Sequence, residues 1–304
     1  MISTNHRPLF VAGQKLEPTT RQSNHRDQES TLNIRDKVII VTGVGSGIGR
    51  ELALCLLSKG ALVAGVDLSA ASLDETAVLA TRNKHPFRGF VVNVADRQSV
   101  DALPEQVIAE FGKVDGIINN AGIIQPFLRL NELDYSIIER VMNVNFYGTL
   151  FVTKAFLPHL LKRPEAHIVN LSSMGGFVPV PGQTVYCAAK AAVKLMTEGL
   201  AAELAHTGIR VTVVCPGAVA SNIRANSGLK GPTTPEANGA ARTAHASKVL
   251  PASKAAAIIV RGMEKDKSHV FVGKDAAFMD KFYRLSPPFA ARTIARKMRA
   301  LLPK

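Results

Sequence analysis

The sequence predicts an α/β fold, in which a single doubly wound domain has a seven-stranded parallel sheet flanked by helices. From Lys37 onward, short runs rich in Val and Ile alternate with amphipathic stretches of helical length, which is typical of repeated βαβ units. The apolar runs are mostly continuous, as expected for strands that are covered on both faces. Right-handed crossovers between such strands place helices on each side of one sheet.

The expected strands and helices follow one another in a regular order along the chain. The expected strands are Val38–Thr42, Leu62–Asp67, Gly89–Val94, Gly116–Asn119, His167–Leu171, Arg210–Cys215 and His269–Val272. The expected helices are Ile48–Lys59, Ser72–Asn83, Arg97–Phe111, Asp134–Leu161, Val185–His206 and Ser253–Lys265. No repeat of the solenoid type is present in the sequence.

The composition is that of an ordinary globular protein. Of the 304 residues, 46% are hydrophobic and 20% are charged, which gives enough apolar surface to offset the entropy of ordering the chain. The three cysteines, Cys55, Cys187 and Cys215, have no CxxC spacing, so we expect neither a disulfide framework nor a metal site. There is no apolar run of ~20 residues and no signal-peptide pattern, and the expected location is the cytoplasm.

Composition also divides the chain into three parts. Residues 1–36 are polar and lack helix or strand periodicity, so we expect a disordered extension. Residues 37–275 form the expected folded domain, and their segment 221–250 is rich in Gly and Pro. Because this segment follows a strand at the edge where such sheets bind ligands, it is a predicted substrate lid. Residues 276–304 form a basic tail, in which positions 281–304 hold seven Lys or Arg and no Asp or Glu.

A glycine-rich loop follows the first expected strand and precedes the first expected helix. Glycines permit a tight turn and let a pyrophosphate approach the backbone, while the helix N-terminus offers amides and its positive dipole end. Tight turns without ligands have the same composition, so the position between strand and helix is what favours a dinucleotide site. The loop residues expected to bind the cofactor are Gly43, Gly45, Ser46, Gly47, Ile48 and Gly49.

An acidic residue, Asp67, stands at the end of the second expected strand. In dinucleotide-binding folds an acid at this place accepts hydrogen bonds from the adenosine ribose hydroxyls. The same carboxylate repels a 2′-phosphate, and neither Ser46 nor Leu68 is a basic residue that would neutralise one. The sequence therefore favours NAD over NADP. A helix cap or a turn residue is the alternative interpretation of Asp67.

The form TGxxxGxG of this loop, together with Asn119-Asn120-Ala121-Gly122, resembles the short-chain dehydrogenase/reductase family over residues 37–273. The resemblance implies a Rossmann-type fold, a nicotinamide cofactor and a homodimer or homotetramer. The family usually has Asp where this chain has Asn93, and the amide of Asn93 still suits an adenine contact. The further cofactor contacts that the resemblance implies are Asn93, Val94, Asn120, Ala121 and Gly122.

Tyr186 and Lys190 lie four residues apart in an expected helix, and so project from the same face. A phenol with a pKa near ~10 is a weak base at neutral pH. An ammonium about 4 Å away contributes on the order of 4 kcal/mol at an effective dielectric near 20, so we expect Lys190 to lower the pKa of the phenol. The resemblance implies that Tyr186 is the acid and base, with Lys190 as its activator and a ribose ligand.

Two further catalytic residues are implied by the resemblance. Ser173 lies thirteen residues before Tyr186, at the place of the family serine that hydrogen-bonds the substrate carbonyl; its neighbour Ser172 fits this spacing less well. Asn145 matches the helix asparagine that holds a water on the proton path, and Asn143 fits less well. After the sixth expected strand, a segment similar to the family's PGxxxT implies contacts with the nicotinamide carboxamide. Its cofactor residues are Pro216, Gly217, Val219 and Ser221, with serine replacing threonine.

These motifs together predict an NAD-dependent oxidoreductase that interconverts a secondary alcohol and a ketone, with a small-molecule substrate. The alternatives are a protein that binds NAD(H) as a redox sensor or scaffold without turnover, and a reductase that uses NADPH. Specific nucleic-acid binding is not expected, because no recognition motif surrounds the basic residues.

The basic tail contains an amphipathic segment, Ala290–Leu302. Its apolar residues share one side, and its arginines share the other. The apolar residues are Ile294, Met298, Leu301 and Leu302, and the arginines are Arg292, Arg296 and Arg299. One interpretation is an interfacial helix that makes peripheral contact with anionic lipid and helps a lipophilic substrate to reach the site. The other is a helix that packs on its own domain or on a partner subunit, with its arginines in solvent.

Overall fold

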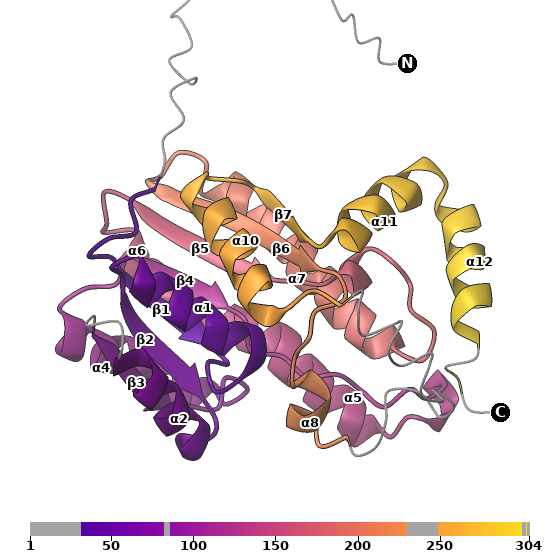
Figure 1. Cartoon of the computed structure of the whole chain (residues 1–304), viewed down its shortest axis with the longest axis horizontal. Helices are drawn as coiled ribbons and strands as arrows, with labels where there is room; N and C mark the ends of the chain where they lie inside the picture. Colours follow the sequence, from indigo (N-terminus) through magenta and orange to yellow (C-terminus); the bar gives the residue numbers. More distant parts are fainter. Residues whose placement is uncertain (1–31, 82–85, 230–248, 300–301, 303–304) are drawn as a thin grey trace, which may run out of the picture. The chain divides into compact units, whose positions relative to one another are not determined.

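Seven parallel strands form one sheet in the order β3-β2-β1-β4-β5-β6-β7, which confirms the predicted fold class (Figure 1). The structure is a computed structural model that describes residues 32–81, 86–229, 249–299 and 302. Most of the predicted extension and residues 230–248 of the predicted lid therefore lie outside the described residues. The strands are β1 (Val38–Thr42), β2 (Leu62–Asp67), β3 (Phe87–Val91), β4 (Gly116–Asn119), β5 (Ala166–Leu171), β6 (Ile209–Pro216) and β7 (His269–Val272).

Helices follow the strands on both faces of the sheet (Figure 1). Apart from the differences described below, the elements end within three residues of the expected positions. The helices are α1 (Gly47–Ser58), α2 (Ala70–Ala80), α3 (Arg97–Asp101), α4 (Leu103–Phe111), α5 (Tyr135–Met142), α6 (Gly148–Leu160), α7 (Thr184–Glu203), α8 (Ile223–Asn226), α10 (Ala252–Glu264), α11 (Lys274–Leu285) and α12 (Pro287–Met298).

Two large apolar layers cover the sheet, one on each face, and a smaller third cluster lies between α5 and α7. Successive residues of a strand point to opposite faces, and β1 shows this directly: Ile39 and Val41 belong to one buried cluster, Val38 and Ile40 to the other. The first cluster lies under α1 and α10, which pack against each other (Figure 1). The second includes the fully buried Phe156 of α6. This two-sided burial explains why the strand sequences are continuously apolar.

The third strand ends earlier than the sequence predicts. It was expected to span Gly89–Val94, whereas β3 ends at Val91, which pairs with Asp67, the last residue of β2. Because β2 ends at Asp67, Asn93 and Val94 have no neighbouring strand with which to form backbone hydrogen bonds. They therefore lie in the loop that follows the strand, at the edge where ligands bind.

Two expected helices are interrupted in the structure. The helix expected over Arg97–Phe111 is divided at Ala102, because Pro104 lacks a backbone N–H and is tolerated only in the first turn of a new helix, α4. The helix expected over Asp134–Leu161 contains a π-helical turn, η3 (Asn143–Tyr147), between α5 and α6. Such turns insert one extra residue into a helix and frequently occur at functional sites.

The basic tail is helical over most of its described length. α11 follows β7 directly and buries Ala276, while α12 buries Ala290 and Ile294 (Figure 1). The amphipathic segment expected from Ala290 thus begins earlier, at Pro287, and its apolar side packs inward. Among the described residues, no helix is both long enough and apolar enough to span a bilayer.

Candidate active site

A cavity of about 940 Å³ opens where the central parallel strands end. Segments that follow β1, β4, β5 and β6 line it, together with the last residues of β2. All residues that the sequence analysis assigned to the cofactor lie on its wall, from Gly43 of the glycine loop to Ser221 beyond β6. Ser173, Tyr186 and Lys190 line the same cavity, whereas Asn145 is fully buried behind it.

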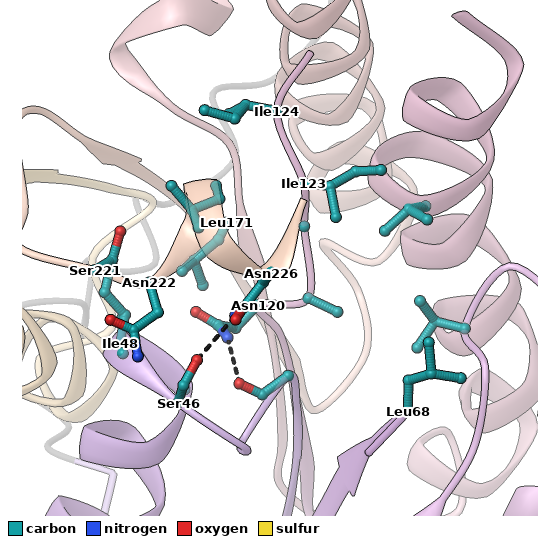
Figure 2. Close-up of a pocket in the computed structure, with 18 of the residues that line it drawn as sticks. Ser46, Ile48, Leu68, Asn120, Ile123, Ile124, Leu171, Ser221, Asn222 and Asn226 are labelled. Carbon is teal, nitrogen blue, oxygen red and sulfur yellow. Dashed lines mark hydrogen bonds between the residues drawn. The ribbon is translucent and has the colours of Figure 1, made fainter. Parts of the chain in front are cut away.

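The glycine loop closes tightly against the end of β4. Gly47 has a φ of +54°, a conformation that side-chain-bearing residues rarely adopt, and a Cβ on Gly49 would lie 1.9 Å from the carbonyl oxygen of Gly43. The Asn120 amide donates to the carbonyl of Thr42 at 2.9 Å and reaches that of Gly43 at 3.3 Å. Figure 2 shows the Asn120 side chain next to the glycine loop, with one of its hydrogen bonds drawn as a dashed line. The loop is therefore fixed with its backbone facing the cavity.

Asp67 lies half-buried at the end of β2 and accepts two backbone hydrogen bonds. Gly45 N–H donates to Oδ2 at 2.8 Å, and Ser69 N–H donates to Oδ1 at 3.0 Å. The helix-cap interpretation is wrong, because the cap of α2 is Ser69, whose hydroxyl accepts from Ser72. The turn interpretation is correct but incomplete, since Asp67 also holds the glycine loop and lines the cavity.

The two candidate serines, Ser173 and its neighbour Ser172, are distinguished by their contacts. Ser172 is buried and donates its hydroxyl to the backbone carbonyl of Lys190 at 2.7 Å, which ties the end of β5 to α7. Ser173 Oγ accepts from Gly175 N–H at 3.0 Å and hydrogen-bonds the Tyr186 side chain. The hydroxyl that meets the phenol is therefore that of Ser173, as the thirteen-residue spacing predicts.

The expected lowering of the Tyr186 pKa by Lys190 is not found. Burial raises the pKa of Tyr186 to about 12, against the opposing effect of the Ser173 hydrogen bond. Burial also lowers the pKa of Lys190 to about 8, and its Nζ donates to the carbonyl of Leu171 at 2.9 Å. The attraction between the two side chains is outweighed here, because both are desolvated by burial and desolvation disfavours the charged form of each.

Asn145 holds the segment that leaves β4. Its Oδ1 accepts from Ile123 N–H at 3.0 Å and its Nδ2 donates to the Ile123 carbonyl at 2.9 Å, so both backbone groups of one residue are satisfied. A Cβ on Gly122 would lie 2.8 Å from Asn145 Oδ1 and 3.3 Å from Lys190 Nζ. The π-helical turn thus places Asn145 next to Lys190, with Gly122 between them.

Gln125 is a residue that the sequence analysis missed. It is fully buried, and its Oε1 accepts from the N–H groups of both Val185 and Tyr186 at 3.0 Å each. Its Nε2 donates to the Gly182 carbonyl at 3.1 Å, and its own carbonyl accepts from Gln183 at 2.8 Å. Gln125 thereby caps the helix that carries the candidate base. The sequence offered one indication of this role, a glutamine inside the apolar stretch after Gly122. Its partners Val185 and Tyr186 lie about sixty residues away, so the contact could not be recognised from the local pattern.

Residues 221–229, the described first part of the predicted lid, contact the cavity wall on two sides, at the glycine loop and at the segment after β4. Asn226 of α8 donates to Ser46 Oγ at 2.8 Å, as Figure 2 shows. Next to it, Ser227 Oγ accepts from Ile124 N–H at 2.9 Å, and the Ser227 carbonyl accepts from Arg140 at 3.3 Å. α8 therefore connects the glycine loop with the segment after β4.

A second unforeseen residue, Asp275, fixes the loop after β6. Its Oδ2 accepts from Ala218 N–H at 2.7 Å, and a Cβ on Gly217 would lie 2.2 Å from the same oxygen. Asp275 lies in the first turn of α11, so this helix, most of which belongs to the basic tail, begins with a residue that holds a loop of the cavity wall. The described residues contain no cluster of His, Cys, Asp or Glu suited to a metal ion.

Comparison with known proteins identifies the family. The family model described as short chain dehydrogenase matches residues 37–230. The chain belongs to the short-chain dehydrogenase/reductase family. The chain is 37% identical over 273 residues to the SadH protein of Mycobacterium tuberculosis, an alignment that covers 88% of this chain and 97% of SadH.

Two further comparisons extend this likeness. The 3-oxoacyl-[acyl-carrier-protein] reductase FabG of Thermotoga maritima is 38% identical over 188 residues, or 61% of this chain and 75% of FabG. A short-chain dehydrogenase/reductase from Burkholderia phymatum, solved in complex with NAD, has a TM-score of 0.74 at 24% identity and covers 85% of this chain and 96% of its own. The latter shows the shared fold. The dehydrogenase is therefore an oxidoreductase of the short-chain type.

Proposed function

We propose that the dehydrogenase is NAD-dependent and interconverts a secondary alcohol and a ketone. The observation that carries this proposal is the meeting of Ser173, Tyr186 and Lys190 with the glycine loop in one cavity. FabG is named as a reductase of 3-oxoacyl groups, and a 3-oxo group is a ketone. That relative therefore supports the same substrate class.

In the proposed mechanism, Tyr186 transfers the proton at the substrate oxygen. Because its pKa is raised to about 12, the phenol is protonated at neutral pH and donates its proton to a ketone oxygen during reduction. In the oxidation direction the acceptor of the alcohol proton would be the phenolate form of Tyr186, so the phenol must first give up its own proton. Ser173 donates a hydrogen bond to the same oxygen, and Lys190 is the proposed ribose ligand. The nicotinamide ring, when bound, supplies or accepts the hydride.

The cavity fits a dinucleotide cofactor on two observations. A Cβ on Gly49 would collide with the carbonyl oxygen of Gly43, so the first turn of α1 can lie this close to the loop only because residue 49 is glycine. The carboxylate of Asp67 stands on the cavity wall at the end of β2, where ribose hydroxyls are bound in this fold class. The glycine loop and Asp67 are proposed to hold the adenosine and pyrophosphate part of the cofactor, and the segment of residues 216–221 its nicotinamide part. Asn145, next to Lys190, completes the proposed catalytic set.

The cofactor preference gives the first prediction. We expect kcat/KM with NAD to exceed that with NADP by about a hundredfold, because the Asp67 carboxylate repels a 2′-phosphate. In Asp67→Ser this ratio should fall at least about tenfold, mainly through a gain with NADP. Initial rates of reduced-cofactor formation measure both values. Asp74→Ser, which removes an exposed carboxylate from α2, is the matched control, and equal rates with both cofactors in the wild type would contradict the assignment.

The reaction class is tested by a panel of secondary alcohols and ketones with NAD or NADH. Turnover of any member by the wild type, lost in Tyr186→Phe, is the expected outcome. Binding of NADH without turnover across aliphatic, aromatic and acyl-thioester substrates would instead favour the sensor or scaffold alternative.

A further inference from the structure

A row of large apolar side chains crosses the outer side of α11 and α12; it consists of Phe278, Phe282, Leu285 and Phe289. The exposed fractions are 64% for Phe278, 86% for Leu285 and 56% for Phe289, which are high values for large apolar side chains. Phe278 and Phe282 stack with ring centroids 5.8 Å apart, and Phe282 meets Phe289 edge-on at 5.9 Å. The row is therefore continuous across both helices; α11 lies next to β7, and α12 packs on α11 (Figure 1).

Basic side chains accompany this row. Lys274 and Lys281 each lie about one helical turn from Phe278, on either side of it along the same face of α11, and all three are exposed. On α12, Phe289 shares its exposed side with the arginines, opposite the buried Ala290 and Ile294. We call this surface the aromatic-basic face; its residues are Lys274, Phe278, Lys281, Phe282, Leu285, Phe289, Arg292, Arg296 and Arg299.

The acidic residues of these two helices are engaged elsewhere. Asp275 accepts from Ala218 N–H, and Asp280 pairs with Arg284 at 2.9 Å on the same helix. The aromatic-basic face itself contains no Asp or Glu. It therefore combines exposed apolar area with an uncompensated positive charge.

We propose that the aromatic-basic face binds the surface of an anionic lipid bilayer. Phenylalanine and leucine side chains enter the boundary between headgroups and acyl chains, while lysines and arginines contact anionic headgroups. The lipid-facing side is the reverse of the one expected from the sequence, because Ile294 packs against the protein and Phe289 faces outward.

The charge pattern favours a bilayer over a second copy of the chain. In a two-fold symmetric contact, the lysines and arginines of one face would meet those of the other without an acidic partner. A nucleic acid would satisfy the positive charge but leave Leu285 and Phe289 exposed to water. An anionic bilayer satisfies both the charge and the apolar area.

The two helices also lie next to the candidate site. Asp275 in the first turn of α11 binds the loop after β6 that lines the cavity. At the other end, Leu302 lies so close to Gly182 that a Cβ there would be 3.0 Å from Leu302 Cδ2. Docking on a bilayer through this face would hold the cavity near the membrane surface.

Sedimentation of the full-length protein with vesicles tests the proposal. We expect it to pellet with vesicles of phosphatidylcholine and phosphatidylserine, to stay in solution with phosphatidylcholine alone, and to be released by salt. Partitioning should fall at least about tenfold in the triple variant Phe278→Ser, Leu285→Ser, Phe289→Ser. It should fall similarly in the charge variant Lys281→Gln, Arg292→Gln, Arg296→Gln, which keeps the apolar residues.

Controls make the outcomes decisive. Val78→Ser removes an apolar side chain that is 68% exposed on α2 and should pellet like the wild type, and NADH binding reports that each variant is folded. Equal pelleting of the wild type with both vesicle types, or of all variants with the anionic ones, would overturn the proposal. So would a changed oligomeric state of the serine variant in sedimentation velocity without vesicles, because the face would then join copies of the chain.

Discussion

Replacing Tyr186 by phenylalanine is expected to lower kcat by at least about a thousandfold, because the proposed acid and base is removed. The phenol hydroxyl meets Ser173 in the cavity, and its loss leaves no other phenol among the residues of the cavity wall. NADH affinity should change by less than about threefold, since the ring itself is retained and the glycine loop is untouched. Steady-state rates and fluorescence titration with NADH measure the two effects separately.

Tyr135→Phe is the matched control, because this tyrosine is 81% exposed on α5 and lies outside the cavity wall. It should retain wild-type kcat. Turnover of Tyr186→Phe within about tenfold of the wild type would remove Tyr186 from its proposed role.

Replacing Gln125 by alanine is expected to reduce kcat by about tenfold to a hundredfold with a smaller change in KM. The substitution leaves the N–H groups of Val185 and Tyr186 and the Gly182 carbonyl without their partner inside the protein. Each orphaned buried group costs about 1–3 kcal/mol, so the melting temperature should also fall. The first turn of α7 would then no longer hold the phenol in place, which stopped-flow rates and thermal unfolding would show.

A second variant, Gln125→Glu, distinguishes whether Gln125 positions the catalytic tyrosine or only stabilises the fold. In Gln125→Glu, the carboxylate still accepts from both N–H groups of α7 but no longer donates to Gly182. We expect it to recover more of kcat than of stability, and to keep the wild-type pH profile. Gln106→Ala, at an exposed site on α4, is the neutral control. An unaltered kcat in Gln125→Ala would show that α7 keeps its geometry without this contact.

Local patterns predicted most of the fold. The continuous Val and Ile runs located the strands, because both faces of the sheet are buried, and the glycines located the loop after β1. The predictions that failed concern features set by tertiary contacts with other elements or by local helix geometry, which the local sequence pattern does not show. β3 ends where its partner β2 ends, at Asp67, and the π-helical turn at Asn145 has no periodic signature that distinguishes it from a continuous helix.

In the candidate site, too, residues within local motifs were predicted, whereas residues that act on distant parts of the chain were not. The residues of the cavity wall were found from motifs in their order along the chain, and Ser173 was separated from Ser172 by spacing. Gln125 and Asp275 were missed because each acts on a backbone segment more than fifty residues away. The raised pKa of Tyr186 was missed because desolvation is a property of the packed interior, which a pairwise estimate between two side chains omits.

The attachment of α8 has a kinetic meaning. Asn226 of this short helix bonds Ser46 on one side of the cavity, and Ser227, which follows it, bonds Ile124 and Arg140 on the other side. Each such bond contributes only about 1 kcal/mol in net terms. We therefore expect the release of a bound product to require these contacts to break and re-form, a step that can limit turnover when it is slower than the chemistry.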